Sequence, residues 1–246
     1  MKVNKPVECG RHDASVASVR FHPDRSVSLV VSAAKDGTCR VWDWSLADGA
    51  RLMAVLAATS GMPPALAGGA AAKVLCRACV VAPTGDAIYS VHSGIRGKAY
   101  VTVWSLAGRS DDGDGDSDGV TAGAANGTAA PLRAACVSEH PATTMAVRAD
   151  GARIAVGNVE GVVGVFELPS LRRVKLYRAH DLPVTGMAFA PPPLLRGTGA
   201  TGAREAASAA VSGGYDLLCC SADYKVSLLT SQGALHLVAV LVVSCF

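Results

Sequence analysis

The amino-acid sequence predicts an all-β fold built from repeated antiparallel hairpins. Between His12 and Asp43, three short apolar runs alternate with polar residues and are separated by turn residues. Alternation of this kind, bounded by Pro, Asp and Gly, is typical of half-buried strands joined by tight turns. The runs lie around Val16–Phe21, Leu29–Ser32 and Cys39–Trp42, and the turns at His22–Asp24 and Lys35–Gly37.

The same spacing recurs along the chain. Pro23, Pro83 and Pro191 each follow three apolar residues at matching offsets, which predicts equivalent first strands. Those triplets are Val16/Val19/Phe21, Cys76/Cys79/Val81 and Val184/Met187/Phe189. Four repeats are therefore expected, beginning near His12, Lys73, Ala135 and Arg178, with an outer strand at Arg51–Leu56 in the first.

The first repeat ends in Val-Trp-Asp, some thirty residues after a His, and so resembles the WD repeat, one blade of a β-propeller. The resemblance implies a partial WD-repeat propeller, about four blades of the usual seven. It also implies a buried hydrogen-bonded tetrad of His12, Ser32, Asp36 and Trp42. The alternative for these residues is a nucleophilic triad, but no Gly-x-Ser-x-Gly turn surrounds Ser32. We therefore assign them a structural role and predict no catalytic residue.

The later repeats depart from this tetrad. Lys98 takes the turn Asp position in the second repeat, and Glu160 takes it in the third, while Asp223 keeps it in the fourth. Phe166 and Leu229 replace the terminal Trp in the third and fourth repeats, whereas Trp104 keeps it in the second.

Composition excludes several function classes. The chain has 246 residues, 50% hydrophobic, with a net charge of +3 and scattered basic residues, so nucleic-acid binding is not expected. Its eight Cys show no disulfide spacing and its N-terminus has no apolar signal segment. Reduced thiols on the cytosolic side are therefore expected.

Three short motifs imitate ligand sites. Cys76-x-x-Cys79 is a single pair on predicted core positions, so we assign it to packing rather than metal or redox chemistry. The segment Asp114–Gly119 opens like a calcium loop, but Ala125 stands where a bidentate Glu belongs. Gly197–Gly202 spells a dinucleotide motif with no strand before it. No metal or cofactor is predicted.

The chain divides into a repeat region and a short tail. Residues 1–233 are predicted to form the partial propeller, with disordered acidic and Pro/Gly-rich insertions near 109–131 and 192–214. Residues 234–246 carry no charge, and a membrane helix needs ~20 residues. From the residues alone, this run is either a final buried strand or the start of a transmembrane segment.

The last three repeats together resemble a group of WD-repeat proteins, the endoplasmic-reticulum exchange factors for the small GTPase that starts COPII coat assembly. The resembling segments are Ala99–Trp104, Val156–Phe166, Arg178–His180 and Val184–Phe189. The resemblance implies guanine-nucleotide exchange in endoplasmic reticulum to Golgi transport, with a GTPase partner. It also implies a membrane anchor beginning near Leu235 that holds the protein at the endoplasmic-reticulum membrane, with the propeller facing the cytosol. It favours the anchor for the tail.

The resemblance carries over no catalytic residue. The family's exchange element lies in its first blade, and only eleven residues precede His12 here. We therefore expect this chain to lack exchange activity by itself. The alternative function is a WD-repeat scaffold that binds other proteins through the propeller surface, and a hydrolase is a distant third.

Overall fold

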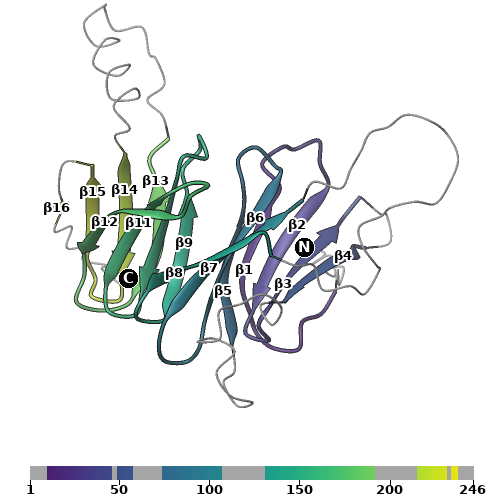
Figure 1. The fold of residues 1–246 in the computed structure, drawn as a ribbon, viewed down its shortest axis with the longest axis horizontal. Helices are drawn as coiled ribbons and strands as arrows, with labels where there is room; N and C mark the ends of the chain where they lie inside the picture. Colours follow the sequence, from purple (N-terminus) through teal and green to yellow (C-terminus); the bar gives the residue numbers. More distant parts are fainter. Residues whose placement is uncertain are drawn as a thin grey trace, which may run out of the picture. The chain divides into compact units, whose positions relative to one another are not determined.

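The computed structural model describes residues 10–45, 49–57, 74–106, 131–191, 215–231 and 234–237. These residues form sixteen strands in four antiparallel four-stranded sheets, and no helix occurs among them (Figure 1). The predicted all-β fold class is confirmed. The chain divides into two compact units, Met1–Pro141 and Ala142–Phe246, and each contains two sheets.

In the first unit, the two sheets follow chain order. The first sheet is β1-β2-β3-β4 and the second is β5-β6-β7-β8. Their strands are β1 Val16–Phe21, β2 Leu29–Ala34, β3 Thr38–Asp43, β4 Arg51–Ala57, β5 Leu75–Val81, β6 Ala87–Ser93, β7 Ala99–Ser105 and β8 Arg133–Ser138.

The second unit repeats this plan. The third sheet contains β9 to β12 and the fourth contains β13 to β16, again with neighbouring strands consecutive in sequence. Their strands are β9 Ala142–Val147, β10 Arg153–Asn158, β11 Val162–Glu167, β12 Arg172–Arg178, β13 Val184–Phe189, β14 Asp216–Ser221, β15 Val226–Thr230 and β16 Ala234–Leu237.

A shared irregularity shows that the sheets are copies of one unit. The pairing of the first strand with the second shifts register at Val16/Ser18 in the first sheet, Cys76/Ala78 in the second and Val184/Gly186 in the fourth. A bulge adds one residue and bends the strand locally. The same bulge at the same offset explains why the apolar triplets are spaced by three and then two residues.

Each unit has a core between its two sheets. In the first unit, Val31 and Val41 of the first sheet pack with Cys79, Ile88 and Trp104 of the second. In the second unit, residues of β10 to β12 pack with the fourth sheet. The buried members there are Ala155, Val163, Val165, Tyr177, Ala179, Val184, Tyr215, Leu217, Cys219 and Leu229. Apolar burial on this scale is the main stabilising term of the fold.

The strand Arg133–Ser138 was expected at the start of the third repeat, but it pairs with β7 as the outer strand of the second sheet. The third sheet begins at Ala142 instead. In each repeat, the outer strand follows the strand that carries the Trp position along the chain. In the second repeat a long insertion separates these two strands, β7 and β8, so Arg133–Ser138 resembles the start of a new repeat in the sequence.

Several predicted features lie outside the described residues. These are the insertion near 109–131 except Pro131, the insertion near 192–214, the calcium-like segment at 114–119 and the glycine motif at 197–202. The start of the uncharged tail is described: Ala234–Leu237 pair with β15 as β16, which agrees with the strand alternative for these four residues. Across the described part of the chain, no helix is long and apolar enough to span a membrane.

Candidate functional site

A chain of hydrogen bonds joins the four tetrad side chains of the first sheet. Trp42 Nε1 donates to Ser32 Oγ at 2.7 Å, Ser32 Oγ lies 2.7 Å from His12 Nε2, and His12 Nδ1 lies 2.8 Å from Asp36 Oδ2. An indole N–H can only donate, so the Ser32 hydroxyl oxygen accepts that hydrogen bond, and the hydroxyl in turn donates a hydrogen bond to His12 Nε2. The imidazole proton therefore sits on Nδ1 and faces the carboxylate. Every donor in this network has an acceptor.

Asp36 is the charged end of the network. Its carboxylate also accepts from the Thr38 amide at 2.9 Å, the Thr38 hydroxyl at 2.7 Å and the Asp13 amide at 3.1 Å. Burial opposes ionisation, but these hydrogen bonds and the one from His12 outweigh it and lower the pKa of Asp36 to about 2. Asp36 is thus ionised at neutral pH and ties the loop before β1 to the β2–β3 turn.

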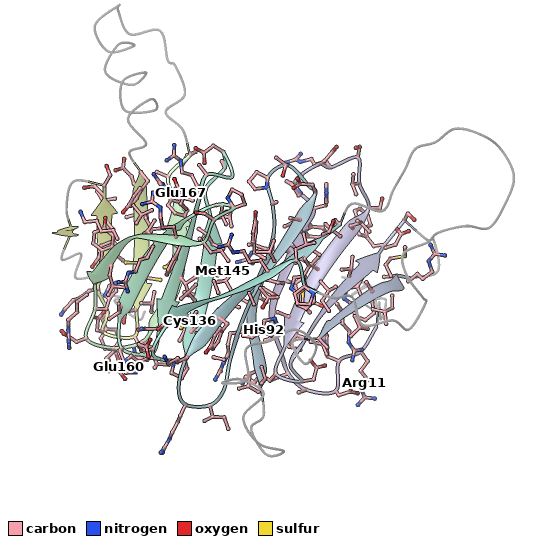
Figure 2. The ribbon with its side chains drawn as sticks, viewed as in Figure 1. Arg11, His92, Cys136, Met145, Glu160 and Glu167 are labelled. Atoms are coloured by element: carbon pink, nitrogen blue, oxygen red, sulfur yellow. The ribbon has the colours of Figure 1, made fainter. Side chains whose placement is uncertain are left out.

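Arg40 strengthens the same junction from its solvent side. Its Nη2 lies 3.2 Å from Asp13 Oδ2 and 3.6 Å from Asp36 Oδ2, and its Nη1 donates to the carbonyl oxygen of Arg11 at 2.5 Å. Arg11 is labelled in Figure 2, in the segment leading to β1. The guanidinium therefore clamps the incoming loop onto the hairpin.

The second sheet builds the network with a histidine from a different element. Trp104 Nε1 donates to Ser90 Oγ at 2.6 Å, and Ser90 Oγ lies 2.8 Å from His92 Nε2. His92, which Figure 2 labels, is on β6 itself, two residues after Ser90. It is fully buried. Burial lowers its pKa to about 4. Its Nδ1 has no hydrogen-bond partner among the described residues.

Sequence reasoning missed His92. The first-sheet residue at its position is Ala34, and the loop position that supplies His12 in the first sheet is Ala72 in the second. The available signal was a Ser and a His two residues apart on one strand, which places both on the same face. Lys98, predicted at the Asp position, instead forms a 3.1 Å ion pair with Glu139.

The third sheet has no such network. Phe166 is buried where the first sheet has Trp42, and Val156 stands at the Ser position. Glu160 occupies the turn, as predicted and as Figure 2 shows, but the turn is held by Asn158, whose Oδ1 accepts from the amides of Glu160 at 2.9 Å and Val162 at 3.0 Å. An apolar core replaces the buried polar chain here.

The fourth sheet keeps His180 and Asp223 and places a cysteine at the Ser position. His180 Nδ1 lies 3.1 Å from Asp223 Oδ2, and His180 Nε2 lies 3.3 Å from Cys219 Sγ. Asp223 also accepts from the amides of Lys225 and Asp181. Burial opposes its ionisation, but these bonds hold the pKa of Asp223 below its usual value. Leu229 is fully buried at the Trp position.

A Cys–His–Asp arrangement is typical of thiol nucleophiles, but this one lacks their properties. A nucleophilic cysteine needs a lowered pKa and access to its substrate. Burial raises the pKa of Cys219 to about 11, and the residue is only 2% exposed. The His180 side chain is fully buried as well. The arrangement is therefore a variant of the first-sheet tetrad rather than an active site.

The Cys76-x-x-Cys79 pair lies in the core of the first unit, as expected for packing residues. Both are buried and free, and Cys39 of β3 joins them in the same cluster. A hydrogen bond with Cys79, together with burial, raises the pKa of Cys39, and burial raises that of Cys76. Within the described ranges, no group of His, Cys, Asp and Glu side chains is arranged to hold a metal ion.

Comparison with known proteins agrees with these sheets. Residues 5–43 match the family described as "WD domain, G-beta repeat". No curated protein matches the chain. The solved structure titled "Structure of U3-55K" is similar with a TM-score of 0.59 and 15% identity, covering 93% of this chain and 53% of that one.

The identity with that structure is low, so the likeness concerns the fold alone. The chain spans about half the length of the similar protein. The Trp–Ser–His–Asp network of the first sheet lies within the matched residues 5–43. Strands β1 to β3 of the first sheet are thus similar to one WD repeat, and the four sheets have the all-β fold of part of a WD-repeat β-propeller.

Proposed function

We propose that this chain is a scaffold that binds other proteins and performs no covalent chemistry. The observation that supports this most is the burial of its chemically versatile side chains. His12 and Asp36 have side chains only 3% and 7% exposed, and those of His180 and Asp223 are equally enclosed. All four hold loops and turns together, so none is free to meet a substrate.

Exposed apolar residues at the turns offer contacts to a partner. Tyr224, in the β14–β15 turn, is 92% exposed, and Leu182 in the loop before β13 is also exposed. Ile95 is exposed in the turn between β6 and β7. A few side chains supply most of the binding energy of a protein interface, and tyrosine is among the residue types enriched there. Tyr224 has a φ of 63°, a conformation that side chains rarely adopt and that is often found at functional positions.

The test compares the partner binding of three tagged variants of the 246-residue chain by quantitative affinity purification. Tyr224→Ala and Ile95→Ala remove turn side chains, while Val174→Ala removes an exposed side chain from the outer strand β12. We expect a reproducible partner whose recovery falls at least about tenfold in a turn variant and is unchanged in the control. Hydrolysis of an ester or thioester that depends on Cys219 would contradict the scaffold function.

The second candidate is guanine-nucleotide exchange on the COPII GTPase at the endoplasmic-reticulum membrane. It is supported by the resembling segments, which form β7, β10 with β11, and β13. Such a factor would favour the nucleotide-free GTPase, because only differential binding shifts an equilibrium. The uncharged tail would anchor the protein, although its first residues form β16 in this structure.

Two measurements test this candidate. Fluorescent-nucleotide release from the GTPase would be followed with this chain and with the native protein isolated from its cells. Exchange by the native protein would support the candidate, and inactivity of both would leave the scaffold function alone. Carbonate extraction of the native protein tests the anchor, because release into the supernatant excludes it.

A further inference from the structure

The outer strand of the third sheet is unusually basic. β12 lies inside the continuous described range 131–191 and contains four basic residues and no acidic one: Arg172, Arg173, Lys175 and Arg178. The outer strands of the other sheets, β4, β8 and β16, contain at most one Lys or Arg each. The positive charge is therefore a property of this strand rather than of the repeat.

One edge of β12 is free. Among the described residues, β11 is the only strand that pairs with it (Figure 1). In an antiparallel pair, every other residue of the outer strand turns its N–H and C=O away from the neighbouring strand. An extended peptide can pair with these outward groups and lengthen the sheet by one strand.

Two of the four basic side chains already have partners in the second unit. Arg172 donates to Glu167 Oε2 from Nε at 3.1 Å and from Nη2 at 2.9 Å. Lys175 Nζ donates to the carbonyl oxygen of Ser231 at 3.1 Å and lies 5.1 Å from the centre of the Tyr177 ring. These contacts fasten β12 to β11 and to the segment after β15. The free edge is thus held in place before any partner binds, which lowers the entropic cost of binding.

The other two basic side chains, Arg173 and Arg178, are exposed, and no described side chain forms an ion pair with either. The register pairs Arg173, Leu176 and Arg178 with alternate residues of β11, so the three share one face of the sheet. A bulge at Val174 keeps Arg173 on this face although it is three positions from Leu176. Leu176 is 54% exposed. We call these three residues the Arg-Leu-Arg row.

We propose that the Arg-Leu-Arg row and the free edge of β12 bind an extended acidic segment of another protein. The segment pairs with β12 as an added strand, and this inference rests on the scaffold function proposed above. Side chains directly opposite on neighbouring strands contact each other, so Asp or Glu belongs opposite each Arg and an apolar residue opposite Leu176.

A contact of this kind already exists on the other side of the same strand. Arg172 and Glu167 are opposite each other in the register of β11 and β12, and their guanidinium and carboxylate groups lie 2.9 Å apart. The carboxylates of an added acidic strand would make the equivalent contact with Arg173 and Arg178. Charge-assisted hydrogen bonds between guanidinium and carboxylate groups are among the stronger polar contacts of proteins.

The same charges disfavour other occupants. A second copy of β12 on the free edge would place Arg beside Arg, and like charges on opposite strands are destabilising. A nucleic-acid backbone carries no N–H donors for the free edge, and its phosphates gain nothing from the apolar Leu176 between the two charges. An acidic peptide matches both the backbone and the charge of this strand.

The test measures binding of a fluorescent peptide to the 246-residue chain by fluorescence anisotropy. The peptide Thr-Glu-Thr-Val-Thr-Glu-Thr places a Glu on each side of a Val on one face of a strand. Matched peptides have Gln or Lys in place of both Glu, or an N-methylated backbone that cannot donate hydrogen bonds. We expect the Glu peptide to bind and each matched peptide to bind at least about tenfold more weakly. Raising the salt from about 50 mM to about 500 mM should weaken binding of the Glu peptide.

Charge reversal assigns the binding to this strand. A double variant with Arg173→Glu and Arg178→Glu should lose the Glu peptide and gain binding of the Lys peptide, which a loss of folding cannot produce. Val174→Ala on the same strand changes no charge, and Arg96→Glu reverses an exposed charge in the β6–β7 turn. Both controls should bind the Glu peptide like the unchanged chain. Circular dichroism of each variant would verify that it is folded.

Three results would overturn the proposal. They are an unchanged chain that does not bind the Glu peptide, a double variant that binds it like the unchanged chain, and equal binding of the N-methylated peptide. A single-stranded DNA oligonucleotide that binds more tightly than the Glu peptide, and only when both Arg are present, would assign the strand to nucleic acid instead.

Two further outcomes are kept apart. The chain has its own acidic run, and a variant with Asn at its five Asp tests whether that run occupies the strand: Asp111, Asp112, Asp114, Asp116 and Asp118. If only this variant binds the Glu peptide, the proposal of a partner segment is wrong. Failure of the peptide test leaves the scaffold function intact, because that function is tested separately by partner recovery with Tyr224→Ala and Ile95→Ala.

Discussion

Ser90 Oγ and His92 Nε2 lie 2.8 Å apart although the two residues are separated by a single position on β6. In the first sheet the equivalent Ser32 reaches a histidine twenty residues away, in the loop before β1. The same hydrogen bond is thus made from two different places in the chain. In both sheets the serine hydroxyl accepts from the indole N–H and donates to a histidine nitrogen. The two sheets share this arrangement because the buried indole and the buried hydroxyl each need a hydrogen-bond partner.

His92 gives the stability of the protein a pH dependence. Its pKa falls from 6.5 to about 4 because burial disfavours the charged ring. The unfolded chain therefore binds a proton between these values and the folded chain does not, so stability is full above 6.5 and falls as the pH drops toward 4. The loss should reach about 3 kcal/mol.

Replacing His92 by Gln should remove this step while leaving the other histidines in place. Urea unfolding of both proteins at a series of pH values measures it. The difference between their free energies of unfolding should change between pH 6.5 and 4 and be constant above. A constant difference throughout would show that His92 is not buried in its neutral form.

The turn glycines should differ in their tolerance of a side chain. Gly161 has a φ of 75°, and an added Cβ would collide with the carbonyl oxygen of His180. Gly97 has a φ of 90° but no atom within 4 Å of that position. Gly97→Ala should cost about 1 kcal/mol from backbone strain, and Gly161→Ala clearly more. Thermal unfolding of the two variants checks the order, and equal effects would contradict the close approach at Gly161.

The described thiols should separate into two reactivity classes. Cys136 and Cys220 are exposed, and the others in the described ranges, Cys39, Cys76, Cys79 and Cys219, are buried. Burial also raises the pKa of Cys219 to about 11, which leaves little reactive thiolate at neutral pH. Iodoacetamide labelling followed by peptide mass spectrometry should modify the exposed pair first. If Cys219 were labelled as fast as Cys220 in the folded protein, Cys219 would be a candidate nucleophile after all.

Much of the fold could be predicted from the sequence because its repeat has a strict register. The offsets at Pro23, Pro83 and Pro191 located β1, β5 and β13, and Asp36 and Asp223 located two hairpin turns. Local turn chemistry and alternation determine these features, so a single sequence contains them.

Other features depend on packing that no local pattern records. The histidine of the second sheet comes from β6 because any buried acceptor within reach of Ser90 serves, and Cys219 replaces a serine because a thiol also fits beside His180. The sheet to which Arg133–Ser138 belongs is decided by pairing across a long insertion. The exposure of Phe21, compared with the burial of Val81, depends on which sheet is present to cover each residue.

The most direct test of the structural role of the tetrad is the Asp36→Ala variant. Without the carboxylate, the buried His12 N–H and the amides of Asp13 and Thr38 lose their acceptor, which should lower the free energy of unfolding by about 1–3 kcal/mol. Because the pKa of Asp36 is about 2, the unchanged protein should lose this contribution as the pH falls from 3.8 toward 2, and the variant should not. Urea unfolding and an esterase assay would be run on both proteins. The account predicts a destabilised variant and no esterase activity in either protein, and a variant that unfolds like its parent but loses an esterase activity would contradict it.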